Sequence, residues 1–169
     1  MSLHIRYRLQ QFARALTGHV SPAERALVTE YLLPGELRLF ERMPRFDQRH
    51  CLDVFHTLVH GGYTDPLLLR AALIHDCGKV DDHGHAIPLL YYGLFVITER
   101  VAPGVYTWAA QSGRGLLWPF AIHATHEERS ARLAEQAGSP PQLVAILRDY
   151  AGSCVTPAAQ ALRRADDQH

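Results

Sequence analysis

Lysine is almost absent from this 169-residue sequence: of its 17 basic residues, only Lys79 is a lysine. An excess of charge of either sign is absent as well, because 17 Asp and Glu residues balance the 17 Lys and Arg residues. Binding along a nucleic-acid backbone requires a broadly basic surface, which a balanced chain does not present. The composition therefore predicts no nucleic-acid partner.

Cysteine is scarce, and long apolar runs are missing. The 3 cysteines are odd in number and none forms a Cys-x-x-Cys pair, so they predict no disulfide framework and favour a reducing setting. The longest apolar run, residues 86–97, has about 12 residues, whereas a membrane span needs about 18 or more. The first residues lack an apolar core of signal-peptide length. These absences predict a cytoplasmic protein without a membrane partner.

Alternating β-branched residues, which would predict strands, are not found. Capping residues, prolines and glycines instead mark the ends of helical segments along the chain. Ser21-Pro22-Ala23-Glu24 combines an N-cap, a first-turn proline and a capping-box glutamate. Later prolines and glycines separate further helical segments, which include residues 45–60, 67–76, 86–101 and a last helix opened by Thr156-Pro157. We therefore predict an all-α bundle of about eight to ten helices.

The chemistry of the sequence centres on the adjacent pair His75-Asp76, which ends an apolar helix and precedes Gly78. Neighbouring helical residues point about 100° apart, so both side chains reach one metal ion only near a helix end or bend. Gly78 predicts such a bend. The mixed nitrogen and oxygen donors suit Mn, Fe, Co, Ni, Zn or Mg. The alternative is an ordinary helix C-terminus whose dipole favours a histidine.

Two further candidate ligands lie beside apolar stripes far from this pair. On a helical wheel, His50 borders the stripe of one helix and so points toward a site. Asp166 flanks the stripe of the last helix, whereas Asp167 points nearly away from it. The two stripes consist of Cys51, Val54, Phe55, Leu58 and Val59, and of Ala158, Ala161, Leu162 and Ala165. The alternative for Asp166 is a solvated, charged tail.

The order His50, His75-Asp76, Asp166 resembles the HD superfamily of metal-dependent phosphohydrolases. The segment RAALIHDCGKV is similar to the His-Asp-x-Gly-Lys signature of that family, and RHCLDVFHTL and LRRADD resemble its first-histidine and last-aspartate helices. The resemblance runs from about residue 47 to residue 167. It implies an HD-type helical bundle in which these four side chains hold one divalent metal ion.

The resemblance leaves residues 1–44 without a recognised motif. We therefore expect one structural domain, in which residues 1–44 form an N-terminal helical extension packed on the core and residues 45–169 form the HD-type metal-binding domain. The resemblance also implies catalytic roles: Asp76 orients or deprotonates a water, and Lys79 holds a substrate phosphate. The alternative for Lys79 is a partner for the dipole at a helix C-terminus.

One part of the sequence departs from the family pattern. Members with two metal ions carry extra histidines, one opening a later helix and others ending the next. His126, with His123 close by, stands at the first place, but Asp149 and Tyr150 stand at the second. We therefore predict one divalent ion per chain rather than two, with His123, His126 and Asp149 as candidate second-site or cleft residues. The alternative for His126 is an ordinary first-turn residue beside a Thr125 cap.

Three functions follow from the resemblance as expectations. The first is metal-dependent hydrolysis of a phosphate ester, of a nucleotide or related small molecule, with Lys79 and His83 binding the substrate; the alternative for His83 is a solvated loop residue. The second is a sensor that binds metal or nucleotide without cleaving it. The third is a di-iron oxygenase, which would need a complete second site. The apolar segment 89–96 is predicted as core or as a dimer face, so a homodimer stays open.

Overall fold

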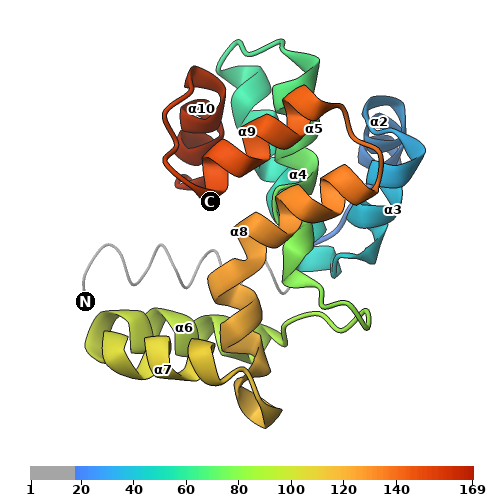
Figure 1. Ribbon diagram of the computed structural model, residues 1–169. Coiled ribbons are helices and arrows are strands. Elements are labelled where there is room, and N and C mark those ends of the chain that lie inside the picture. Colours follow the sequence, from blue (N-terminus) through green and yellow to red (C-terminus); the bar gives the residue numbers. More distant parts are fainter. Residues whose placement is uncertain (1–17) are drawn as a thin grey trace, which may run out of the picture.

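The computed structural model describes residues 18–169, and this part of the chain is helical without a β-strand (Figure 1). Its nine α-helices confirm the predicted all-α class. They are α2 (Pro22–Tyr31), α3 (Pro34–Arg42), α4 (Arg45–His60), α5 (Pro66–Ile74), α6 (Leu89–Val101), α7 (Pro103–Ser112), α8 (Trp118–Gln136), α9 (Pro141–Ala151) and α10 (Pro157–Asp166), with the 3-10 turns η1 (Cys77–Lys79) and η2 (Gly115–Leu117).

Several helix starts coincide with signals in the sequence. The hydroxyl of Ser21 accepts a hydrogen bond from the Glu24 N–H at 3.2 Å, and the Glu24 carboxylate accepts one from the Ser21 N–H at 2.9 Å, which confirms the predicted capping box. The side chains of Asp65 and Thr156 cap α5 and α10 by accepting backbone N–H groups. Helix α4 has the bounds that the sequence predicts.

Helix α8 is longer than the sequence suggests. The prediction of a capped helix start at Thr125 is wrong, because α8 runs unbroken from Trp118 to Gln136 with Pro119 in its first turn. The Thr125 hydroxyl instead donates to the Ala121 carbonyl at 2.8 Å, inside the helix. A threonine hydroxyl can serve either role, so the local pattern does not distinguish them. His126 is therefore a mid-helix residue.

The buried side chains form two clusters of different size. The larger core involves α2 to α5, the second half of α8, α9 and α10. Helices α2 and α3, the described part of the predicted extension, contribute Val28 and Phe40 to this core; residues 1–17 lie outside the described part. The smaller core contains Phe95 and Phe120, where the hairpin of α6 and α7 packs on the start of α8. In Figure 1, α6 and α7 lie side by side at one end of α8.

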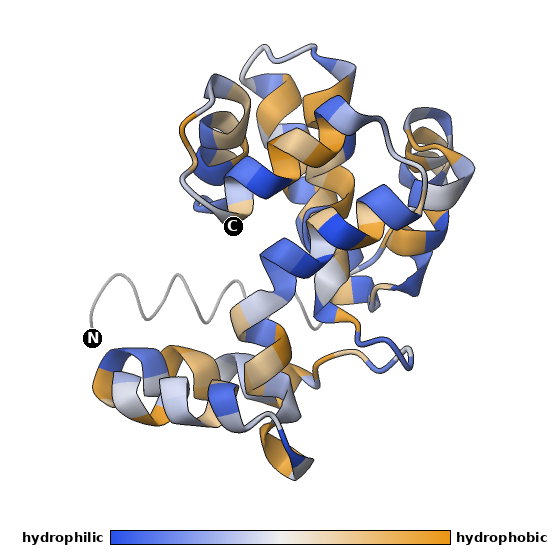
Figure 2. Cartoon of the chain, viewed as in Figure 1, coloured by the Kyte–Doolittle hydropathy of each residue, from blue (hydrophilic) through white to orange (hydrophobic). Residues whose placement is uncertain are grey.

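The hairpin of α6 and α7 exposes much of its apolar surface, and Figure 2 colours much of both helices as hydrophobic. Leu90 is 74% exposed, Val101 77% and Trp108 62%, whereas Phe95 is buried. Segment 89–96 therefore has one face in the smaller core and another on the surface, and the homodimer stays a prediction. Among the helices of the described residues, none combines the length and apolar character that crossing a bilayer demands.

Candidate metal centre

The pair His75-Asp76 lies at a bend between α5 and the turn η1. Helix α5 ends at Ile74, and Asp76 leaves the helical conformation with φ −100° and ψ 3°. The bend requires Gly78, because a Cβ at that position would overlap the His126 carbonyl and lie 2.7 Å from the backbone nitrogen of Ser130 on α8. The Gly78 N–H also donates to the Ser130 hydroxyl at 2.8 Å. Close packing of η1 on α8 thus sets the direction of both candidate ligands.

Four side chains from three separate parts of the chain converge at this bend. Ligand atoms of His50, His75 and Asp76 all lie within 4.8 Å of one another, so this group could hold a metal ion. His50 Nε2 lies 3.4 Å from Asp76 Oδ2 and 2.9 Å from Asp166 Oδ1. His75 Nε2 lies 3.6 Å from the same oxygen of Asp166. The structure thus brings together the four residues that the sequence singles out as ligands.

His75 has the orientation of a metal ligand. Its Nδ1 donates to the Ala72 carbonyl at 2.8 Å, which directs Nε2 toward the cluster. Nε2 is buried and has no hydrogen-bond partner within the described part of the chain. An unpartnered buried nitrogen is unfavourable, and a metal ion would use its lone pair. Together with one further imidazole and two carboxylates, this donor set fits a divalent ion.

Electrostatics keep both carboxylates of the cluster ionised. Burial acts to raise the pKa of Asp76, but the charges of Lys79 and His75 outweigh it and hold that pKa well below its ordinary value. Burial also opposes ionisation of Asp166, but the neighbouring imidazoles of His50 and His75 outweigh it and lower its pKa. Burial acts to lower the pKa of His75, but the charge of the neighbouring Asp76 outweighs burial and raises that pKa well above its ordinary value. A metal ion would therefore compete with a proton for this histidine.

Tyr150 is a neighbour of the cluster that the sequence does not reveal as a partner of Asp166. Its hydroxyl donates to Asp166 Oδ2 at 2.7 Å, and its ring meets the His75 ring edge-on with centroids 5.8 Å apart. The Arg163 guanidinium lies over the Tyr150 ring at 3.9 Å. These contacts hold Asp166 so that Oδ1 faces the histidines. No local pattern signals this pairing, because it joins two helices.

Lys79 lies between two buried carboxylates. Its Nζ contacts Asp76 Oδ2 at 2.5 Å and lies 3.9 Å from Asp47 Oδ1. Asp47, another residue that the sequence does not reveal, is 3% exposed, and its Oδ1 accepts a hydrogen bond from the Tyr92 hydroxyl at 3.4 Å. Burial raises the pKa of Asp47 to about 6, against the opposing charge of Lys79. Burial also opposes the charge of Lys79, but Asp76 outweighs it and raises the lysine pKa.

Of the candidate second-site residues, His126 adjoins the cluster and His123 lies beyond it. His126 Nε2 is 3.4 Å from Asp76 Oδ1, and its Nδ1 donates to the His123 carbonyl at 2.5 Å. The His123 ring stacks on Phe95 with centroids 4.1 Å apart, and its Nδ1 is 2.7 Å from the Tyr106 hydroxyl. Burial in this aromatic core lowers the pKa of His123 to about 3, so its ring is neutral at neutral pH.

Asp149 and His83 are not brought into the cluster. The Asp149 carboxylate accepts the Val155 and Thr156 N–H groups at 3.1 and 2.8 Å and so holds the loop between α9 and α10. Asp149, one of the candidate second-site residues, therefore contacts this loop, and its neighbour Tyr150 is the residue that contacts Asp166. His83 is exposed in the loop after η1, and its ring lies 6.2 Å from that of His85.

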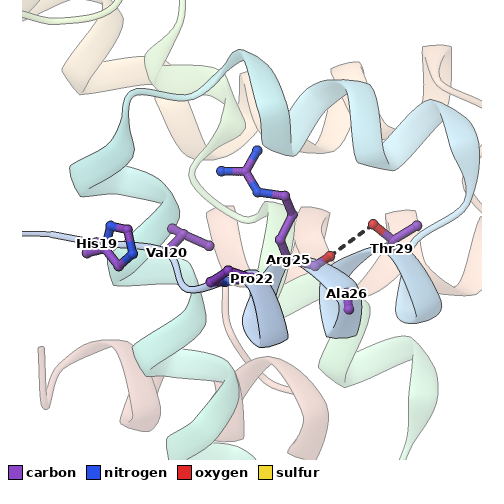
Figure 3. Close-up of a pocket in the computed structure, with 6 residues that line it drawn as sticks. All are labelled: His19, Val20, Pro22, Arg25, Ala26 and Thr29. Carbon is purple, nitrogen blue, oxygen red and sulfur yellow. Dashed lines mark hydrogen bonds between the residues drawn. The ribbon is translucent and has the colours of Figure 1, made fainter.

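The hollow drawn in Figure 3 is separate from the cluster. It lies at the start of α2 and is lined by His19, Val20, Pro22, Arg25, Ala26 and Thr29. The Thr29 hydroxyl donates to the Arg25 carbonyl at 2.9 Å. The lining includes no carboxylate side chain, and we assign no metal site to it.

Comparison with known proteins identifies no family for this chain. No family model, no curated protein and no solved structure matches the chain. Any function must therefore be inferred from the cluster of His50, His75, Asp76 and Asp166 itself.

Proposed function

We propose that this protein is a metal-dependent phosphohydrolase of the HD type, which cleaves a phosphate ester of a nucleotide or related small molecule. One observation carries the proposal: four donors converge on one point, and among the described residues the buried Nε2 of one of them has no hydrogen-bond partner. These donors are His50, His75, Asp76 and Asp166. Two imidazoles and two carboxylates suit a divalent ion, and their order along the chain resembles that of the family.

A divalent ion bound here would polarise a phosphoryl oxygen and lower the pKa of a water. The chain supplies the orientation and the surrounding charge. The Ala72 carbonyl orients His75 and the Tyr150 hydroxyl orients Asp166, so both donors are positioned before a substrate arrives. Asp76 orients or deprotonates the attacking water. The ammonium of Lys79, beside Asp76, offsets the negative charge of a phosphate.

Metal content and phosphate release test this proposal together. Protein purified without chelators is expected to contain one divalent ion per chain and to release phosphate from nucleotides or generic phosphoesters with Mn²⁺, Co²⁺, Ni²⁺ or Mg²⁺. His75→Ala and Asp76→Asn are each expected to reduce release by more than about 100-fold, because even an outer partner of a ligand contributes 10–100-fold. His60→Ala, at an exposed histidine of α4, is the control and keeps activity. A folded, metallated protein without turnover on any of these substrates would refute the proposal.

A sensor that binds metal or nucleotide without cleaving it is the second candidate function. The observation that favours it is Tyr150, because two-metal members of the family carry histidine near this position. Tyr150 contacts Asp166 instead, and Asp149 accepts hydrogen bonds from the loop after α9. A nucleotide that stabilises the fold without product formation would support a sensor; at 100 times its Kd, a ligand adds about 2.7 kcal/mol. Two irons per chain would instead support the di-iron oxygenase.

A further inference from the structure

We infer that the outer face of α6 binds a second copy of this chain, with the two α6 helices antiparallel across a two-fold axis. The inference concerns a surface that the metal centre does not use, and it does not depend on the proposed function. Four side chains define this surface, which we call the α6 seam: Leu90, Leu94, Ile97 and Val101.

The α6 seam is apolar and exposed. Leu90 is 74% exposed, Leu94 40%, Ile97 58% and Val101 77%, whereas Phe95 on the opposite side of the helix is buried. Single exposed apolar side chains are ordinary on a protein surface, but a continuous row of them marks an interaction site. The hairpin of α6 and α7 lies at the end of the molecule away from α9 and α10 (Figure 1), so a second chain has access to the seam.

The spacing of the seam fits one other helix. Its four residues follow one another at intervals of four, three and four, which is the heptad pattern by which two helices pack side by side. At about 100° per residue, the four side chains fall within about 60° of one another around the helix axis. A helix that lies on a lipid surface or over a broad core has a wider apolar stripe, of about 100° or more. The narrow seam therefore favours a helix as its partner.

The spacing is also the same in both directions along the helix. A two-fold axis between residues 95 and 96 therefore places Leu94 opposite Ile97 of the second copy, and Leu90 opposite Val101 of the second copy. An interface between identical chains about a two-fold axis must be complementary to itself in this way. The seam meets that condition when the two helices are antiparallel.

The charges beside the seam favour the antiparallel pair over a parallel pair or a membrane. Residues 89–112 contain one acidic and one basic residue, Glu99 and Arg100. Glu99 is turned toward α8, where its Oε1 lies 3.8 Å from His123 Nδ1. In an antiparallel pair the two Arg100 side chains lie about 14 Å apart along the axis, beyond the screening length of about 8 Å, whereas a parallel pair places them side by side. Anionic membranes attract clusters of Lys and Arg, which this segment lacks.

The size of the apolar surface predicts a dimer of moderate affinity. Helix α7 adds Val105 and Trp108, which are 53% and 62% exposed, to the apolar surface of the hairpin. With the seam, these side chains offer on the order of 400 Å² of apolar surface. A specific interface buries about 800 Å² on each partner, of which about 57% is apolar. The hairpin therefore supplies the apolar part of an ordinary interface, and we expect a reversible dimer with a micromolar Kd.

Sedimentation of the full chain between about 5 and 500 µM tests the inference. The wild type is expected to shift from monomer to dimer as the concentration rises. Ile97→Glu places a charge at the centre of the seam, so we expect the Kd of the dimer to rise by more than about 100-fold. Val155→Glu, at an exposed apolar residue between α9 and α10, is the matched control and is expected to dimerise like the wild type.

Engineered cysteines test the orientation. Leu90→Cys together with Val101→Cys places two thiols opposite each other in an antiparallel dimer, so oxidation is expected to join two chains covalently. Leu90→Cys alone is expected to give no covalent dimer above background, because the two copies of residue 90 lie about 17 Å apart along the helices and a disulfide requires Cα atoms within about 7 Å. The wild type, in which Cys154 is partly exposed, gives that background.

Each outcome supports or overturns the inference. A wild type that stays monomeric at the highest concentration overturns it, also when the protein then pellets with vesicles of phosphatidylcholine and phosphatidylserine, which assigns the face to lipid. A dimer that persists in folded Ile97→Glu overturns the seam as its contact. Equal crosslinking of Leu90→Cys and the double variant overturns the antiparallel pair. If Ile97→Glu does not fold, Leu90→Glu makes the same test: loss of the dimer supports the seam and retention overturns it. None of these measurements uses metal or turnover, so they stand apart from the tests of the proposed function.

Discussion

Asp166 and Asp167 are adjacent carboxylates with opposite surroundings. Asp166 accepts the Tyr150 hydroxyl and lies 2.9 Å from His50 Nε2, whereas Asp167 is exposed. Asp166→Asn removes a negative charge next to the metal centre, so we expect the affinity for Mn²⁺ to fall by more than about 100-fold. Asp167→Asn is the matched control and is expected to change stability by no more than about 0.5 kcal/mol, with unchanged affinity. Calorimetric titration of both variants measures this.

The two variants also test the orientation of α10 and whether this helix belongs to the metal centre. Loss of metal in Asp167→Asn would contradict the orientation of α10. Unchanged affinity in both variants would mean that the metal is held without α10. In that case the centre consists of His50, His75 and Asp76, which by themselves lie within 4.8 Å of one another.

The sequence reveals residues of the site where the pattern is local, and misses them where the contact joins distant segments. The pair His75-Asp76 is recognisable because an apolar helix runs into it, and Asp166 because its helical phase can be read from the neighbouring stripe. Tyr150 and Asp47 have no such signal. Their roles come from a hydroxyl that reaches another helix and from an ion pair across the core. A side chain of this kind becomes visible only when the helices are placed in space.

At the scale of elements, Glu24 links α2 to α4. Its carboxylate is 2.5 Å from Arg49 and also accepts the Ser21 N–H of the capping box. Burial opposes ionisation, but the hydrogen bonds from Arg49 and Ser21 outweigh it together and lower the pKa of Glu24 from 4.5 to about 2. A carboxyl group with a lowered pKa stabilises the fold above its ordinary pKa. That contribution is lost as the pH falls from about 4.5 through about 2.

Glu24→Gln tests this link between helices. Glutamine can keep the capping box, so the variant removes mainly the negative charge that pairs with Arg49. We expect the free energy of unfolding at pH 7 to fall by up to about 1 kcal/mol, and the difference from wild type to shrink toward zero near pH 2. Urea unfolding between pH 2 and 7 measures both, with Glu30→Gln at an exposed position of α2 as the control. A difference that does not change with pH would contradict the charge as its cause.

Helix positions were predictable where caps and prolines mark them, and less so where only periodicity is available. Helix α4 has its predicted bounds, but Val59, predicted in its buried stripe, is 41% exposed. The last turn of α4 extends past the core, since residues 59–62 are all exposed. A helical wheel gives the direction of a side chain but not the extent of the neighbours that cover it. The same limit explains Thr125, whose capping pattern lies within a continuous helix.

At the scale of the whole molecule, the candidate ligands join α4, the bend after α5, and α10, which are far apart in the sequence. An ion that binds only the folded chain would therefore stabilise all three elements together. We expect Mn²⁺ at 100 times its Kd to raise the free energy of unfolding by about 2.7 kcal/mol. Thermal unfolding with added Mn²⁺ and with chelator measures this, and His75→Ala is expected to show no shift. Metal binding without any shift in the wild type would contradict a site made by these elements.

The single lysine also makes this protein unusually simple to observe at one point. Reductive methylation with ¹³C-formaldehyde labels amines, and the 169-residue sequence holds one lysine side chain, Lys79, besides the terminal amino group. An NMR spectrum of the labelled protein would contain one lysine-derived methyl resonance, arising beside Asp76 and Asp47. Its chemical shift would report the surroundings of the cluster as divalent ions or phosphate are added, without resonance assignment of the rest of the chain.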